Sequence, residues 1–169
     1  MKKMIMIALV ALVSFGAYAQ HDHAGHNEKT SDQSTVVFKD DKLGTAYEHY
    51  IHLKDALVAS NAGEAKQAAD ALQKSLVALS NGKKASDNAA KIAASTDLNE
   101  QRMVFSDLSN EMKSLVKEAK LASGVLYVEY CPMANNNQGA FWLSNEKQIK
   151  NPYFGDSMLK CGSVKETIQ

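Results

Sequence analysis

The chain has 169 residues, with 19 basic and 19 acidic side chains, so its formal net charge is zero. Such a balance gives no basic surface for nucleic acid or an anionic membrane, and we expect neither as a partner. The length fits a single domain after an amino-terminal export segment.

The first residues have the parts of a secretory signal peptide. Lys2 and Lys3 supply positive charge, and the apolar run from Ile5 to Phe15 is too short to be a stable membrane anchor. Ala17 and Ala19 provide the small side chains that signal peptidase needs, so we expect cleavage after Ala19. An uncleaved anchor is the alternative, which the short run and the small residues disfavour.

The chain is therefore expected to divide into a signal peptide over 1–19, a disordered histidine-containing tail over 20–37 and a domain over 38–169. Removal of the signal peptide leaves 17 basic and 19 acidic residues, a net charge of −2. We expect this mature form to be periplasmic or secreted and not to span a membrane, because no second apolar run approaches membrane length.

The expected tail is polar and lacks large apolar residues through position 35, so it cannot bury enough surface to offset chain entropy. It carries His21, His23 and His26, whose imidazoles suit Cu(II), Zn(II) or Ni(II). The alternative is a polar spacer that holds these histidines by chance.

Four helices are predicted from apolar residues that recur at three- and four-residue steps, over 40–60, 62–79, 83–95 and from 98 to about 122. Short connections between them predict antiparallel packing.

Residues suited to capping mark where the predicted helices begin and end. Asn61 and Asp97 are placed as N-caps, with Glu64 and Glu100 placed to return a bond in a capping box. Gly82 suits a left-handed position after the second helix.

The chain changes character after Gly124. Residues 125–130 are β-branched and aromatic and predict a short strand, and an irregular segment follows. The fold class we expect is all-α: an antiparallel bundle of three to four helices with a short β/irregular C-terminal segment. Both cysteines and the only tryptophan, Trp142, lie in that segment, so we expect the specific chemistry there, with Trp142 as a core anchor.

Cys131 and Cys161 are the only cysteines. In an oxidising compartment two such cysteines most often form a disulfide, which is one hypothesis. A second notes the methionine near each cysteine, in Cys131-Pro132-Met133 and Met158-Leu159-Lys160-Cys161. Two thiolates and two thioethers form a soft ligand set that selects Cu(I) or Ag(I). Free thiols are the third possibility.

Other candidate residues carry weaker signals. His49 and His52 lie three apart on the first predicted helix and face one side, where a metal role competes with simple solvation. No Ser/His/Asp arrangement and no paired carboxylates are found, so we do not expect an enzyme.

The C-terminal segment resembles the family called domain of unknown function 3347. The resemblance covers about residues 40–168. It rests on these stretches: Leu53–Ser60, Glu100–Phe105, Leu108–Ser109, Tyr130–Asn136, Gly139–Ser144 and Asn151–Gly162. Relatives carry a histidine near a tryptophan in the third helix, and residues 81–96 here contain neither.

Members of that family occur as small secreted proteins and as C-terminal domains of periplasmic adaptor subunits of heavy-metal efflux pumps. The resemblance therefore implies copper handling, with Cu(I) as the ion and an efflux adaptor as a possible partner. We expect a periplasmic protein that binds copper or silver and sequesters it or delivers it to an efflux system. The alternative is a structural or interaction module of an envelope or efflux assembly, with a Cys131–Cys161 disulfide.

Overall fold

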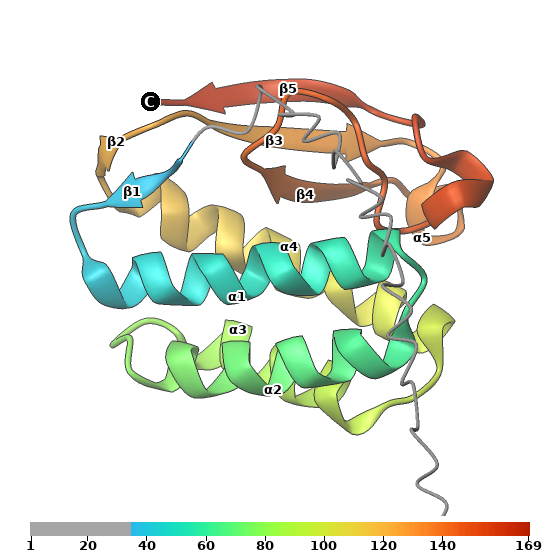
Figure 1. The fold of residues 1–169 in the computed structure, drawn as a ribbon, viewed down its shortest axis with the longest axis horizontal. Helices are drawn as coiled ribbons and strands as arrows, with labels where there is room; N and C mark the ends of the chain where they lie inside the picture. Colours follow the sequence, from blue (N-terminus) through green and yellow to red (C-terminus); the bar gives the residue numbers. More distant parts are fainter. Residues whose placement is uncertain (1–34) are drawn as a thin grey trace, which may run out of the picture.

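The computed structural model describes residues 35–169, and it arranges them in three layers (Figure 1). A three-stranded sheet lies on one side, helices α1 and α4 pack beneath it, and α2 and α3 form the layer farthest from the sheet. The expected signal peptide and the tail histidines His21, His23 and His26 lie outside the described residues.

The four predicted helices are confirmed. They are α1 (Asp41–Val58), α2 (Ala62–Val77), α3 (Lys83–Ala94) and α4 (Leu98–Glu118). Each buries an apolar stripe, and consecutive helices pack side by side from α1 to α4. A one-turn helix, α5 (Ala134–Asn137), and a short 3-10 turn, η1 (Gly155–Met158), occur in the C-terminal half.

Both predicted N-caps form, but without the reciprocal glutamate bonds. Asn61 Oδ1 accepts from the Glu64 backbone N–H at 3.0 Å, and Asp97 Oδ1 accepts from the Glu100 backbone N–H at 3.0 Å. The Glu64 carboxylate instead pairs with His52 Nε2 at 2.7 Å, and the Glu100 carboxylate accepts from a serine hydroxyl. Competing partners for the two glutamates therefore replace the capping box.

The expectation of a left-handed Gly82 is wrong. Gly82 has φ −80° and caps the start of α3. Glycine is needed there for space, because a Cβ at this position would lie 2.2 Å from the Leu76 carbonyl oxygen. Close approach of the chain to the end of α2, and not a positive φ, explains the residue.

Two antiparallel sheets are present among the described residues, so the all-α class is wrong although the bundle itself is correct. Strand β1 (Val37–Phe38) pairs with β2 (Leu121–Ser123), and Val37 therefore belongs to the fold. The larger sheet has the order β4-β3-β5, with β3 (Leu126–Cys131) between β4 (Ala140–Ser144) and β5 (Ser163–Ile168). The predicted strand at 125–130 corresponds to β3.

The fourth helix ends earlier than its pattern predicts. It stops at Glu118, and the residues Leu121–Ser123 pair with β1 instead of continuing the helix. Non-local pairing with a segment more than 80 positions earlier overrides the local helical preference at this point. The segment after Cys131, which we expected to be irregular, supplies β4 and β5.

Aromatic side chains join the layers into one core. Their rings contact one another in a continuous series that crosses from β1 through the helices to the sheet. Successive ring centroids lie 5.3 to 6.3 Å apart in the order Phe38, Tyr47, Tyr50, Phe105, Tyr153 and Trp142. Trp142 is fully buried, which confirms its expected role as a core anchor.

The hydroxyl of Tyr50 connects three elements at the centre of this series. It lies 2.8 Å from Ser109 Oγ on α4, and it accepts a hydrogen bond from the Leu143 backbone N–H of β4 at 3.0 Å. All three groups are buried, so the Tyr50 hydroxyl supplies a hydrogen-bond partner to the other two in the interior. The position of the sheet over the bundle is thereby fixed by one side chain of α1.

Residues 35–169 include no helix whose length and apolar character suffice to cross a bilayer.

Replacing Tyr50 by Phe is predicted to destabilise the fold by about 1–3 kcal/mol, because the buried Leu143 N–H loses the hydroxyl that accepts its hydrogen bond and Ser109 loses one of its contacts. Tyr47→Phe is the matched control, since the Tyr47 hydroxyl is buried without a hydrogen bond and its removal should be neutral or stabilising. Urea unfolding of both variants measures the difference. Equal losses in the two variants would contradict a special role for the Tyr50 hydroxyl.

Candidate functional site

The two cysteines, 30 positions apart in sequence, meet at one end of the sheet. Cys131 is the last residue of β3, and Cys161 stands two positions before β5, whose Ser163 pairs with Tyr130 of β3. The two side chains lie close enough to interact, and no disulfide joins them in this structure. Cys131 is fully buried, whereas Cys161 is partly exposed.

Gly162 shapes the chain beside Cys161. Its φ of +142° is one that residues with a side chain rarely adopt. A Cβ there would lie 2.8 Å from Trp142 Cη2 and 3.1 Å from the Tyr130 carbonyl oxygen. The absence of a side chain at 162 therefore lets the segment that carries Cys161 pack tightly against β3 and β4.

Asn151 holds the segment that leads to Cys161. It is fully buried, its Nδ2 donates to the Cys161 carbonyl at 2.8 Å, and its backbone N–H donates to the Leu159 carbonyl at 2.9 Å. Its Oδ1 accepts from the Tyr153 backbone N–H at 2.8 Å, which fixes the turn that follows. One buried amide thus positions the chain on both sides of η1.

Contact between the thiols changes their chemistry. The pKa of Cys161 is raised, chiefly by its hydrogen bond with Cys131, with smaller contributions from burial and from the charge on Cys131. The backbone N–H of Met133 bonds to the Cys161 sulfur and acts in the opposite direction. Without a cation the pair therefore favours the protonated thiol at Cys161.

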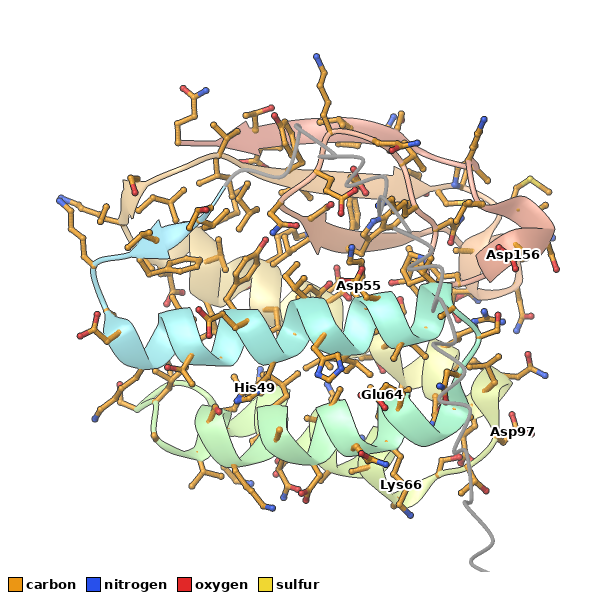
Figure 2. All side chains as sticks on the ribbon, viewed as in Figure 1. His49, Asp55, Glu64, Lys66, Asp97 and Asp156 are labelled. Carbon is orange, nitrogen blue, oxygen red and sulfur yellow. The ribbon has the colours of Figure 1, made fainter. Side chains whose placement is uncertain are left out.

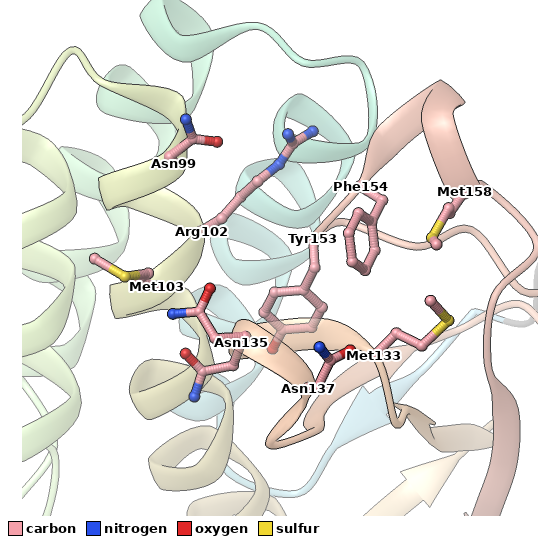
Figure 3. A pocket seen from close by; sticks show the side chains of 10 residues that line it. Asn99, Arg102, Met103, Met133, Asn135, Asn137, Tyr153, Phe154 and Met158 are labelled. Carbon is pink, nitrogen blue, oxygen red and sulfur yellow. The ribbon is translucent and has the colours of Figure 1, made fainter.

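The two predicted thioether ligands come together in a pocket beside the thiols. Met133 and Met158 both line a cavity of about 400 Å³, and Figure 3 shows them on the same side of it, next to Phe154. Met103 of α4 lines the opposite side, and the sequence analysis did not select it. Neither cysteine lines this cavity, so the four predicted ligands form a thiol pair and an adjacent thioether pair.

Met103 and Met133 stand out by their exposure. Their side chains are 52% and 46% exposed, and they are two of the four large apolar residues that the described part of the chain leaves open to solvent. Met103 falls within the apolar pattern of α4, and sequence alone gave no sign that it faces outward. An exposed thioether remains available to a ligand or a partner.

Three asparagines form the rim of the pocket in an unusual conformation. Asn135, Asn136 and Asn137 have φ values of 51°, 56° and 64°, in the left-handed region that asparagine tolerates better than most residues. All three line the cavity. The three asparagines thus form a turn of left-handed residues, which sets polar amides beside the thioethers.

Arg102 ties the pocket to the bundle. Its Nε donates to the Pro152 carbonyl and its Nη2 donates to the Leu57 carbonyl and to Ser60 Oγ, each at 2.9 Å. The guanidinium therefore joins α4, the end of α1 and the turn before η1. This use of its donors makes Arg102 a structural part of the pocket wall.

The helix histidines do not join this site. His52 pairs with Glu64 across α1 and α2, and Figure 2 shows His49 and Glu64 between these two helices. Residues 35–169 contain no group of three or more His, Cys, Asp and Glu side chains placed to hold a metal ion. A metal held at Cys131 and Cys161 by more than these two sulfurs would need the methionine sulfurs or exogenous ligands to complete its coordination.

A buried carboxyl group lies two positions before Cys131 on β3. Glu129 is fully buried, its two oxygens lack well-formed hydrogen bonds, and burial raises its pKa to about 8. The charge of Lys54 and the indole N–H of Trp142 partly oppose this shift. Lys54 is itself only 1% exposed and pairs with Asp55 at 2.6 Å. Sequence patterns gave no sign that these charged residues are interior.

Together these features define a helical bundle covered by a small antiparallel sheet, with paired thiols beside a thioether-lined pocket. The family described as "Protein of unknown function (DUF3347)" matches residues 46–124, which supports the resemblance given by the sequence. The match runs from within α1 to the end of β2, and it stops before Cys131. No curated protein and no solved structure matches the chain.

Replacing Gly162 by Ala is predicted to destabilise the protein by about 1–3 kcal/mol and to disturb the thiol pair, because of the positive φ and the contact with Trp142. Gly44→Ala is the control, since a Cβ there has no neighbour within 4 Å and a helical Gly→Ala change stabilises by about 0.5–1 kcal/mol. Thermal unfolding monitored by Trp142 fluorescence compares the stabilities of the Gly162→Ala and Gly44→Ala variants. A Gly162→Ala variant as stable as the parent would contradict the packing described.

Glu129 is predicted to make stability fall as pH rises. Its folded pKa of about 8 lies above the ordinary value of 4.5, so between these values the folded state binds more protons than the unfolded state. Relative to the parent, Glu129→Gln should gain stability across this window, by at most about 1.4 kcal/mol per pH unit.

Urea unfolding between about pH 5 and pH 8 measures this effect, with the exposed Glu48→Gln as the control. The control should differ from the parent by an amount that does not change with pH. Parallel pH profiles for the parent and Glu129→Gln would show that the carboxyl group is not perturbed.

Proposed function

We propose that the protein binds a soft monovalent cation, Cu(I) or Ag(I), as its cargo. The ligands are the thiols of Cys131 and Cys161 together with the thioethers of Met133 and Met158. The observation that carries the proposal is the contact between two thiols far apart in sequence, next to a pocket lined by the methionine near each of them.

The donor chemistry supports a soft ion. Thiolate and thioether sulfur prefer Cu(I) and Ag(I), while hard cations favour carboxylate oxygens, and no carboxylate of the described residues lines the pocket. Binding displaces the thiol protons, so the cation takes the place of the hydrogen bond that now joins Cys131 and Cys161. The partly exposed Cys161 and the open pocket give an ion access from solvent.

Met133 supports the idea that thiols and thioethers act together. Its backbone N–H bonds to the Cys161 sulfur, and its side chain lines the pocket with Met158. The same residue therefore borders both sulfur pairs. Closure of the pocket around an ion needs rotation of flexible methionine side chains, which have three rotatable bonds.

The cellular setting follows from the sequence. A signal peptide predicts export, and the family resemblance implies an association with heavy-metal efflux. We propose that the protein sequesters the ion in the periplasm or delivers it to an efflux adaptor. His21, His23 and His26 are proposed as an accessory site for Cu(II) or Zn(II), with His49 and His52 as weaker candidates. No catalytic role is proposed.

The second candidate function is an interaction module whose cysteines form a disulfide. The contact between the two thiols favours it as directly as it favours a metal, because a disulfide also needs the sulfurs side by side. A thiol count on the exported protein, followed by Cu(I) titration, discriminates between the two functions.

Met133→Leu and Met158→Leu are predicted to lower Cu(I) affinity by about tenfold or more, equivalent to about 1.4 kcal/mol, while the fold stays intact. Leucine preserves size and apolarity, so the stability loss should be below about 1.5 kcal/mol. Met112→Leu is the matched control, because Met112 is fully buried in the core. Competition with a Cu(I) chelator measures affinity.

Trp142 offers a second readout, since it is the only tryptophan and its ring lies against Gly162, next to Cys161. Its emission should change on Cu(I) addition to the parent and saturate at one ion per chain. If both methionine variants bind Cu(I) as the parent does and the exported protein has no free thiols, the metal site is wrong and the disulfide module is correct.

A further inference from the structure

The two thiols differ in a way that a metal site does not require. Cys131 is fully buried at the end of the central strand β3, whereas Cys161 is partly exposed in the segment before β5. A reagent in solution therefore has access to Cys161 and not to Cys131. The pairing of Tyr130 with Ser163 sets Cys131 and Cys161 beside each other at the same end of the β3–β5 ladder, and the two thiols interact, so a group attached to Cys161 lies near the second sulfur.

The framework holds this asymmetric pair in place. Five residue pairs join β3 to β4 and fix Cys131 opposite Ala140. On the other side, Asn151 binds the Cys161 carbonyl, and the Cys161 N–H donates to the Met158 carbonyl at 3.0 Å. Both backbones are therefore set before any chemistry at the sulfurs, which is the arrangement that intramolecular exchange requires.

We propose that Cys161 is a thiol–disulfide exchange site that accepts a low-molecular-weight disulfide and passes the new bond to Cys131. The consequence of this exchange rests on the proposed function. The resulting Cys131–Cys161 disulfide removes both thiolate ligands and releases the soft metal ion. Reduction restores the site.

The exchange balances in two steps. The Cys161 thiolate attacks one sulfur of the external disulfide, which forms a mixed disulfide and expels one thiolate. The Cys131 thiolate then attacks the Cys161 sulfur, which forms the protein disulfide and expels the second thiolate. The two protein thiols are oxidised, the external disulfide is reduced to two thiols, and the two protein protons pass to the expelled thiolates.

Metal and oxidant compete for the same sulfur atoms. An ion bound by both thiolates blocks the attack by Cys161, and the protein disulfide leaves only the thioethers of Met133 and Met158. Thioethers alone form a weaker set of donors for Cu(I), because they lack negative charge. The pair therefore couples retention of the cargo to the redox state of the compartment.

Single-cysteine variants test the order of the two steps, with oxidised glutathione as the probe. Cys131→Ala keeps the exposed thiol and lacks the buried one, so it should accumulate a mixed disulfide that carries one glutathione. Cys161→Ser keeps only the buried thiol and should react at least tenfold more slowly while folded. Reduced parent protein should proceed to the internal disulfide without retaining glutathione. Mass spectrometry of samples quenched with acid follows all three reactions.

Denatured protein provides the matched control. In urea the two single-cysteine variants should react at similar rates, because burial no longer protects Cys131. Equal rates for the folded variants, after circular dichroism has shown both to be folded, would overturn the assignment of Cys161. Arrest of the parent at the mixed disulfide would overturn the transfer to Cys131.

Titration with Ag(I) separates this inference from the proposed function. Reduced parent should bind Ag(I) at least tenfold more tightly than the parent oxidised by glutathione. If reduced parent does not bind Ag(I), the proposed function fails, and the coupling to cargo fails with it, while the exchange chemistry is still decided by mass spectrometry. If reduced and oxidised proteins bind Ag(I) equally, the redox coupling is wrong and the metal site itself stands.

Discussion

The Tyr50 hydroxyl is the contact on which the arrangement of sheet and bundle depends. It bonds to Ser109 of α4 and accepts the Leu143 N–H of β4, so three elements share one buried polar group. Because β4 pairs with β3 along its length, this contact also places the strand that ends at Cys131. The thiol pair is therefore positioned, through backbone hydrogen bonds, by a side chain of the first helix.

Sequence patterns predicted the helices well because the relevant information is local. Apolar spacing and the side chains of Asn61 and Asp97 locate the helix starts within a residue or two. The strands β4 and β5 were missed because their pairing is non-local. The sequence of β4, AFWLS, lacks the polar alternation of a one-sided strand, and β5 places Lys165 and Glu166 in its centre. Only the register with β3 identifies them as a sheet.

The candidate site, like the fold, was predicted only in part from the sequence. The association of each cysteine with a methionine was visible in the sequence, and the structure brings the thiols into contact and the two methionines into one pocket. The exposure of Met103 and the burial of Glu129 could not be predicted. Helical periodicity does not reveal an outward-facing methionine, and charged residues are expected to face solvent. The exposed Met103 lies at the pocket and the buried Glu129 lies near the thiols. Residues that depart from the usual burial pattern are commonly found at functional sites.

The residues that match the family model and the sulfur residues occupy different parts of the chain. The matched residues 46–124 supply the helices and β2, and none of Cys131, Met133, Met158 and Cys161 lies within them. The matched part of the bundle therefore contains none of the proposed sulfur ligands. The site depends instead on the C-terminal segment, whose strand β4 bonds to Tyr50 and whose turn before η1 bonds to Arg102. A substitution at either attachment point thus acts on the sulfur pairs through backbone position, whereas a substitution at a sulfur acts on binding with the scaffold unchanged.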